Sequence, residues 1–175
     1  MIIDILNSVL RFIFLILLQL LVINNIELNT YINPYIYPLF ILTLPVSIKP
    51  WQIVILSFLT GMVMDTFSST PGLHMAATTF MGYLRIFYLK FAANKEDFEV
   101  RLAPTLSKKG PVWFMLYTFI LIFVHHLLLF YFEVYGLSEF FRTFLRVLGS
   151  TLFSVLLIGL GQILFYKVAQ GKRNG

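Results

Sequence analysis

Long runs of apolar residues, separated by short polar stretches, constrain this chain more than any other feature. Of its 175 residues, 59% are hydrophobic and 12% are charged, whereas a soluble domain is nearer half apolar and a quarter charged. One water-soluble core of this size cannot hide so many Leu, Ile, Val and Phe side chains. We therefore expect an all-α integral membrane protein, because helices satisfy their own backbone hydrogen bonds in lipid.

The apolar runs predict a single transmembrane domain over residues 1–168, followed by a basic, disordered cytoplasmic tail at 169–175. One continuous helix over residues 35–67 would measure roughly 50 Å at 1.5 Å per residue, against a hydrocarbon core of ~30 Å. Lys49, Pro50 and Trp51 interrupt that run with two interfacial residues and a proline. We therefore divide the run and expect six transmembrane helices, at about 5–23, 35–48, 50–66, 73–92, 111–132 and 140–168.

The basic residues predict the orientation, because cytoplasmic loops carry an excess of Lys and Arg. With six helices and a cytoplasmic N-terminus, only Arg142 and Arg146 lie on the outer side. The other eleven of the thirteen Lys and Arg lie inside: Arg11, Lys49, Arg85, Lys90, Lys95, Arg101, Lys108, Lys109, Lys167, Lys172 and Arg173. The long polar loop at 93–110 is then cytoplasmic, and so are both termini.

The stretch from Gly61 to Ala76 joins the third and fourth predicted helices and concentrates polar residues. Ser57, Gly61 and Asp65 are spaced by four, so they share one helix face suited to close packing. We expect Asp65 to accept hydrogen bonds from Ser68 or Ser69, or from free N–H groups at the start of the next helix. The alternative is a proton or substrate site, which needs a partner group within reach.

Three histidines are the remaining candidates for chemistry. His74 could pair with Asp65 across the turn. His125 and His126 lie deep in the fifth predicted helix, and at least one of them should hydrogen-bond a neighbouring helix. Adjacent positions point about 100° apart, and HExxH spacing is absent, so we expect no metal there. The chain has no cysteine, so a thiolate metal site and a disulfide are excluded. We expect no cofactor and no nucleic-acid partner.

Arg142 and Arg146 stand four apart on the predicted outer side. They could pair with Glu133 or Glu139, hold lipid phosphates, or meet an acidic patch of a partner. We expect Arg85 and Lys90 to reach the cytoplasmic interface along their own stems. Other small polar residues, Ser150 and Ser154, permit a close helix contact.

The layout resembles the rod shape-determining protein MreD family of bacterial membrane proteins. The resemblance rests on Gly61-x3-Asp65, a Ser/Thr turn that includes Ser68, and Gly72-Leu-His74-x-Ala76 at the start of the fourth helix. The basic loop before the fifth helix also fits. In layout the resemblance covers most of the chain, whereas in motif it covers residues 61–76.

The resemblance implies a non-enzymatic scaffold in the complex that elongates the bacterial cell wall, located in the cytoplasmic (inner) membrane. The implied partners are membrane lipids, a single-span MreC-like protein and, indirectly, MreB, RodA and a penicillin-binding transpeptidase. The implied fold is similar to that of the S components of vitamin transporters. A substrate-binding S component is therefore the alternative function, and an enzyme acting on lipid-linked substrates is a third.

Overall fold

The computed structural model describes residues 2–26, 32–92, 97, 102–134 and 139–174. Residues 93–96 and 98–101 of the predicted basic loop at 93–110, and residues 135–138 between Glu133 and Glu139, lie outside the described residues. All regular structure in the described part is helical: α1 (Ile2–Leu21), η1 (Ile23–Asn25), α2 (Leu39–Leu42), α3 (Pro50–Ser68), α4 (Leu73–Ala92), α6 (Leu106–Lys109), α7 (Pro111–Val134) and α8 (Phe140–Asn174).

Four helical stretches of the described chain are long and apolar enough to cross a membrane: Leu6–Asn25, Pro50–Ser68, Pro111–Val134 and Phe140–Leu164. The prediction of an all-helical membrane protein is confirmed in this form, but the count of six transmembrane helices is not. α4 has 20 residues, as many as α1. It also carries Arg85, Lys90 and several hydroxyl groups, which lower its hydropathy.

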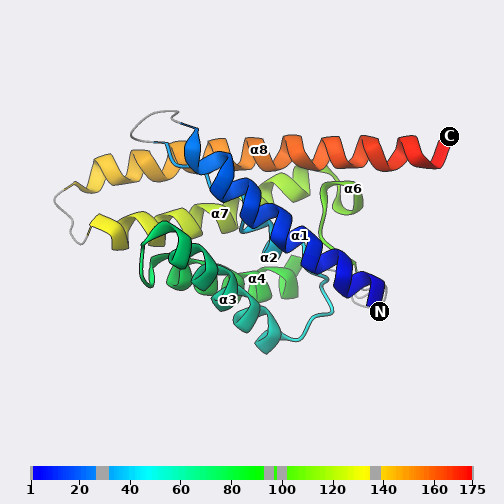
Figure 1. The fold of residues 1–175 in the computed structure, drawn as a ribbon, viewed down its shortest axis with the longest axis horizontal. Helices are drawn as coiled ribbons and strands as arrows, with labels where there is room; N and C mark the ends of the chain where they lie inside the picture. Colours follow the sequence, from blue (N-terminus) through cyan, green and yellow to red (C-terminus); the bar gives the residue numbers. More distant parts are fainter. Residues whose placement is uncertain (1, 27–31, 93–96, 98–101, 135–138, 175) are drawn as a thin grey trace.

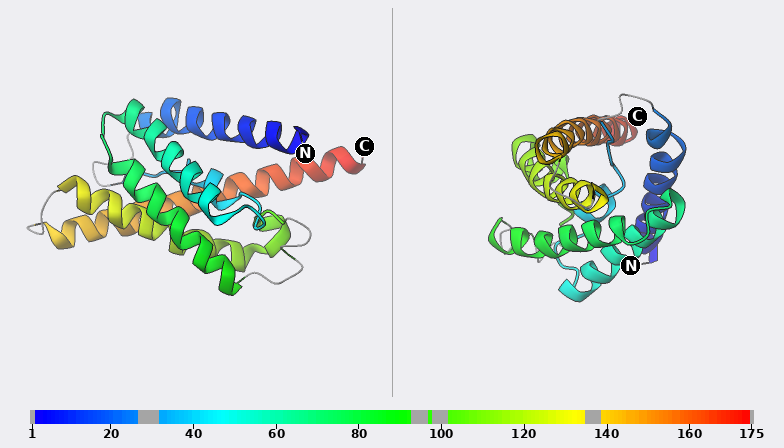
Figure 2. Two further views of the ribbon diagram at one scale, coloured as in Figure 1. Left: turned by 90° about the horizontal axis from the view of Figure 1, so that it is seen from below. Right: turned by 90° about the vertical axis from the view of Figure 1, so that its left-hand side faces the viewer.

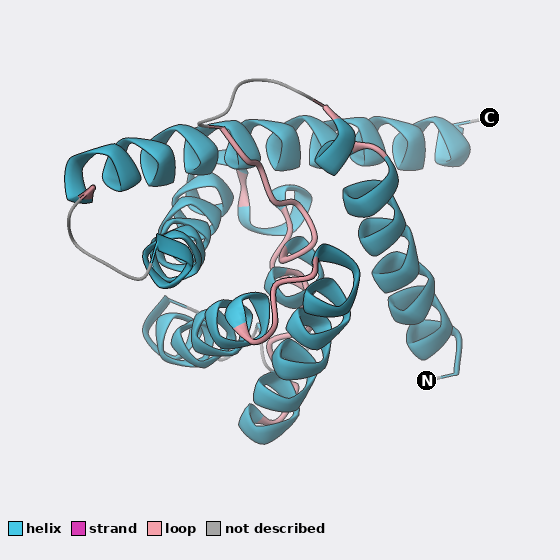
Figure 3. Cartoon of the chain, turned by 60° about the vertical axis from the view of Figure 1, so that its left-hand side comes forward, coloured by secondary structure: helices cyan, strands magenta, loops and turns pink. Residues whose placement is uncertain are grey.

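The predicted helix at 35–48 is wrong. Only the four residues of α2 are helical there, and residues 32–36 and 43–48 form extended or turn-like chain (Figure 3). Prolines 34, 38 and 45 explain the difference, because each removes an N–H donor and restricts the residue before it. We call residues 32–48 the central segment.

The central segment is the core of the molecule. Tyr37, Ile41 and Leu42 have no exposed surface, and Leu44 is 3% exposed. Figure 1 shows the segment behind α1, and Figure 2 shows it enclosed by α1 and by the α3–α4 and α7–α8 pairs. Irregular backbone is tolerated at membrane depth only when protein surrounds it. The surrounding helices must therefore supply the missing hydrogen bonds.

α3 and α4 form a closely packed hairpin. α3 begins at Pro50, where a proline is favourable because its missing N–H would have no partner. It ends at Ser68, and the next residue, Ser69, has a φ of 54° that turns the chain toward α4. A Cβ placed on Gly61 would lie 2.5 Å from the carbonyl oxygen of His74, and one on Gly82 would collide with Ser57. The Ser57–Gly61–Asp65 face is therefore the packing face.

α8 continues to Asn174, so the predicted helix end at 168 and the disordered tail are both wrong. Its 35 residues measure about 52 Å at 1.5 Å per residue, well beyond a ~30 Å hydrocarbon core. α1 begins and α8 ends at the same end of the molecule (Figure 1). Thus α8 extends past the bundle at the end where the chain begins.

Candidate functional site

Asp65 ties the last turn of α3 to the first turn of α4. Its Oδ1 accepts from the Thr70 hydroxyl at 3.0 Å and from the His74 N–H at 2.9 Å. Its Oδ2 accepts from the N–H groups of Gly72 at 3.1 Å and Met75 at 2.9 Å. A carboxylate at a helix N-terminus satisfies free donors and complements the helix dipole. The expected contact with backbone N–H groups is present.

The turn departs from expectation in its hydroxyl partners and in its histidine. Thr70, not Ser68 or Ser69, binds the Asp65 carboxylate. The Ser68 hydroxyl is buried without a hydrogen-bond partner among the described residues. The His74 ring does not pair with Asp65 but turns into the protein. Gly72 has a φ of 88°, a backbone conformation that favours glycine at this position of the turn.

Tyr37, in the central segment, is the hub of a buried polar cluster that the sequence did not reveal. Its hydroxyl lies 3.1 Å from His74 Nδ1, 2.8 Å from Thr78 Oγ1 and 2.7 Å from His125 Nε2. All four side chains are 1% exposed or less. A buried hydroxyl or imidazole needs a hydrogen-bond partner. Because the partners of Tyr37 come from α4 and α7, the cluster joins the central segment to these two helices.

His126 points away from this cluster, toward α8. Its Nδ1 lies 2.8 Å from the Ile122 carbonyl oxygen, and its Nε2 lies 3.4 Å from Ser154 Oγ. The two adjacent histidines therefore serve different neighbours, as their angular separation predicts. The prediction that at least one of them hydrogen-bonds a neighbouring helix is confirmed, since His126 contacts Ser154 of α8 and His125 Nε2 lies 3.4 Å from Thr78 Oγ1 of α4. No group of three or more His, Cys, Asp or Glu suited to a metal ion occurs in the described part of the chain.

Ser150 and Ser154 bind the backbone at the beginning of the central segment. Ser150 Oγ accepts from the Asn33 N–H at 3.0 Å, and Ser154 Oγ accepts from the Tyr35 N–H at 2.9 Å. On the opposite side, Gln19 of α1 accepts from the Ile36 N–H at 2.7 Å. Its amide nitrogen donates to the Pro34 carbonyl at 3.1 Å.

The other end of the central segment is held by a buried arginine. Arg85 is 2% exposed; it donates to the Leu44 carbonyl and, from Nε, to the Tyr117 hydroxyl at 3.0 Å. Tyr117 in turn donates to the Leu42 carbonyl at 2.9 Å. The expectation that Arg85 reaches the interface is therefore wrong. The guanidinium finds its partners inside the protein, in the Leu44 carbonyl that follows α2 and in the Tyr117 hydroxyl.

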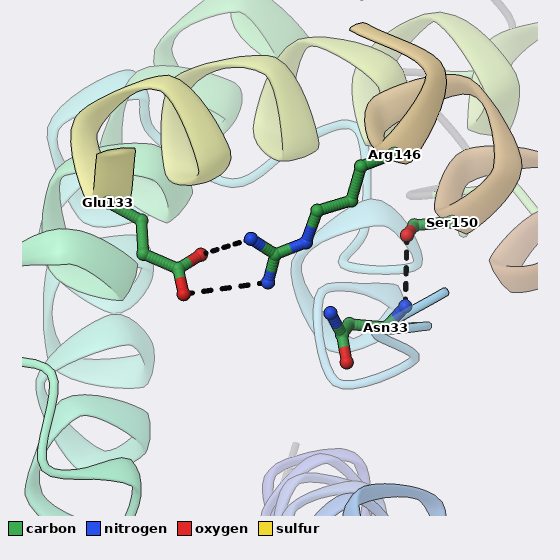
Figure 4. A network of polar contacts seen from close by, with 4 residues as sticks. All are labelled: Asn33, Glu133, Arg146 and Ser150. Atoms are coloured by element: carbon green, nitrogen blue, oxygen red, sulfur yellow. Dashed lines mark hydrogen bonds and ion pairs between the residues drawn. The ribbon is translucent and has the colours of Figure 1, made fainter. Parts of the chain in front are cut away.

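Arg146 is engaged within the chain, whereas Arg142 is mostly exposed. Arg146 forms an ion pair with Glu133 at 3.0 Å (Figure 4). Its guanidinium also lies 4.1 Å from the centre of the Phe130 ring. With its oxygen turned toward Arg146, the Asn33 amide accepts from Nε at 3.1 Å and Nη2 at 2.8 Å. Arg142 pairs with Glu139 at 3.3 Å, and both side chains are about half exposed. The expected pairing with the two glutamates is thus present.

A cavity of about 270 Å³ lies beside the Asp65 turn, between η1, the start of the central segment and the α3–α4 corner. Its walls include Asn24, Asn33, Tyr35, Ser68 and His74. A second hollow, of about 470 Å³, is an apolar groove on the outer face of α3 and α4. Phe58, Gly72, Ala76 and Tyr83 are among its lining residues.

Comparison with known proteins yields no relative: no family model, curated protein or solved structure matches the chain.

Proposed function

We propose that this protein is a non-enzymatic membrane scaffold of the MreD type, acting in the bacterial cell-wall elongation complex. It binds an MreC-like single-span protein within the inner membrane and, through the assembly, MreB, RodA and a penicillin-binding transpeptidase. The proposal includes six chain passages, the second of them irregular, and cytoplasmic N- and C-termini. It also includes a fold similar to that of the S components of vitamin transporters.

The observation that carries the proposal is the apolar groove between α3 and α4. Two of the residues that bear the family resemblance, Gly72 and Ala76, line this groove. Gly61 and Asp65 bring the two helices together on the inner face, whereas Gly72 and Ala76 leave small side chains on the outer face. Small residues let the backbone of a second helix approach closely in lipid. The groove suits a single transmembrane helix of the partner.

The use of the buried polar groups also supports a structural role. Gln19, Arg85, Tyr117, Ser150 and Ser154 all bind the backbone of the central segment. These groups maintain the fold of the helix bundle. The outer helix faces then remain for contacts with lipid and with other membrane proteins.

The direct test is affinity purification of the tagged full chain from native membranes of a rod-shaped host. An MreC-like single-span protein is expected among the copurifying proteins. Ala76→Phe fills the groove and should abolish this copurification, with membrane abundance unchanged. Leu152→Phe is the matched control, since Leu152 is 61% exposed on α8, away from the groove. Copurification that survives Ala76→Phe contradicts the assignment of the groove.

Depletion tests the cellular role. Rods are expected to become round, because the elongation complex loses its membrane scaffold. Rods that keep their normal shape contradict the proposal. Copurification of an ATPase in place of the MreC-like protein would assign the chain to the vitamin-transporter alternative.

A further inference from the structure

The cavity beside the Asp65 turn contains polar groups that the fold itself does not use. His74 is 1% exposed and lines the cavity. Its Nδ1 binds Tyr37, and its Nε2 makes no hydrogen bond with any described residue. The Ser68 hydroxyl lines the same cavity and is buried without a described partner. Leaving a buried polar group unpaired costs more than a typical hydrogen bond gains. Ser68 supplies one such group at this cavity, and the free His74 Nε2 lies in the same wall, which indicates a ligand.

Two side-chain amides in the same wall have their oxygens occupied. Asn24 Oδ1 accepts from the Gln19 amide at 2.8 Å. Asn33 Oδ1, turned toward Arg146, accepts from its guanidinium at 2.8 Å and 3.1 Å. Figure 4 draws the Asn33 amide with its nitrogen toward Arg146; once the two atoms are exchanged, the N–H2 group takes the end directed away from Arg146, on the side where α1 runs. The groups left at the cavity are thus two N–H2 donors, the Ser68 hydroxyl and one imidazole nitrogen.

We propose that this cavity binds an uncharged small molecule that presents carbonyl oxygens, of the amide, lactam or ureide class. Amide N–H2 groups and a hydroxyl are donors that match carbonyl acceptors. An anion is disfavoured because the described walls carry no Lys or Arg, and Arg146, which binds the wall residue Asn33, already pairs with Glu133. A cation is disfavoured because the Asp65 carboxylate is saturated by backbone and hydroxyl donors. The site does not depend on the scaffold proposal.

The size and walls of the cavity define the ligand further. Its 270 Å³ lie just below the usual range of small-molecule sites, about 300–1,000 Å³. Ile23, Ile26 and Ile32 line it together with the Tyr35 ring. Apolar and aromatic walls with a few convergent polar groups are typical of such sites. The ligand is therefore a compact ring whose carbonyl edge meets the amides and Ser68.

The test uses the full chain in lipid nanodiscs and equilibrium dialysis with radiolabelled nicotinamide and uracil as probes. Pyridine and pyrimidine, which lack carbonyl groups, are the comparison compounds. Native mass spectrometry of freshly purified protein is carried out in parallel. We expect saturable binding of a carbonyl-bearing probe, or a copurifying neutral molecule that contains a carbonyl. The proposal is overturned if both results are absent, or if pyridine and pyrimidine bind as tightly as the probes.

Variants locate the binding. Ser68→Ala should weaken it by about 5-fold, the equivalent of one neutral hydrogen bond. The variant should not lower thermal stability, because the hydroxyl has no partner in the empty protein. Ser68→Phe fills the cavity and should abolish binding. Thr118→Val is the matched control, since it removes another buried, unpartnered hydroxyl, from α7 and outside the cavity walls. Binding that both Ser68 variants leave unchanged places the ligand elsewhere and refutes the site.

Discussion

Single polar side chains in this protein stabilise backbone that would otherwise be unpaired in an apolar setting. Asp65 binds three N–H groups and a hydroxyl at one turn, and Tyr37 connects His74, Thr78 and His125. A hydrogen bond contributes about 1 kcal/mol, but a buried group left unpaired costs about 1–3 kcal/mol. Removing such a residue therefore lowers stability mainly because its former partners stay buried without a hydrogen bond.

Asp65→Ala should lower the free energy of unfolding by ~2 kcal/mol or more, because it removes a helix cap and leaves buried N–H groups unpaired. The measurement is thermal unfolding of the purified chain, together with its abundance in membranes. Glu139→Ala is the control, since that carboxylate belongs to an exposed ion pair, a class worth about 0–1 kcal/mol. Full stability of Asp65→Ala with lost partner binding would instead make Asp65 an interface residue.

Tyr37→Phe should destabilise the protein by about 1–3 kcal/mol, because three buried polar side chains each lose their hydrogen bond to the Tyr37 hydroxyl. Thermal unfolding measures the loss. Tyr83→Phe removes the same atom from a side chain that is 48% exposed and should have almost no effect. Equal stability of the two variants contradicts the role given to the Tyr37 hydroxyl.

The sequence predicted the Asp65 cap on the backbone N–H groups of α4, but neither its hydroxyl partner, Thr70, nor the arrangement of the buried cluster. A small residue, an acid and a following helix start are local features, so their spacing predicts the cap. His74 and His125 both bind the Tyr37 hydroxyl, although Tyr37 lies 37 positions before His74 and 88 positions before His125 in the chain. No local pattern marks such a pair. Arg85 was misplaced for the same reason, since its partner at Leu44 lies 41 positions away.

The central segment is the element that distinguishes this fold from a simple helix bundle. Its backbone is bound by α1 through Gln19, by α8 through Ser150 and Ser154, and by α4 and α7 through Arg85 and Tyr117. The sequence predicted a membrane passage there from its apolar residues. Hydropathy cannot separate a helix from an irregular chain that neighbours enclose, although the prolines mark the breaks.

Two substitutions test whether side chains hold the central segment. Ile41, in α2, is fully buried, and the native chain has no cysteine. Ile41→Cys should resist a water-soluble maleimide in detergent. Adding Gln19→Ala and Ser154→Ala should speed labelling by roughly 10-fold or more, because two backbone-binding groups worth ~1 kcal/mol each are lost. Thr66→Ala is the control, since Thr66 only binds its own helix. Unchanged labelling in the triple variant contradicts this role.

Glycine substitutions test the α3–α4 contact. Gly61→Ala should destabilise strongly, because the new Cβ meets backbone of α4 at 2.5 Å and α4 would have to move. Gly82→Ala should cost less, since the Ser57 hydroxyl can rotate away and the remaining contact, with the Ser57 Cβ, is 2.8 Å and not 2.5 Å. Gly161→Ala meets nothing within 4 Å and should be neutral or stabilising by up to ~1 kcal/mol, as alanine favours the helix. Thermal unfolding ranks the three, and a different order contradicts the packing described.

At the scale of the whole molecule, the positions of the two chain ends and the charge bias predict one orientation in the membrane. Ser107→Cys, next to the basic residues Lys108 and Lys109, should react with an impermeant thiol reagent only in inside-out vesicles. Glu139→Cys, near the start of α8, should react in intact cells whose outer membrane has been opened. Labelling with the reverse pattern contradicts cytoplasmic termini.

The dependence of the central segment on α8 also determines when the protein can finish folding. The N–H groups of Asn33 and Tyr35 bind serines that lie 117 and 119 residues later in the chain. At 5–20 residues per second, the ribosome reaches those serines roughly 6–24 s after Tyr35. During that time Gln19 of α1 can bind the backbone at Pro34 and Ile36, but the N–H groups of Asn33 and Tyr35 lack their partners, and the insertion machinery or earlier helices must shelter them. A nascent chain that stops before α8 therefore exposes unpaired backbone to lipid, which makes completion of the last helix a checkpoint in biogenesis.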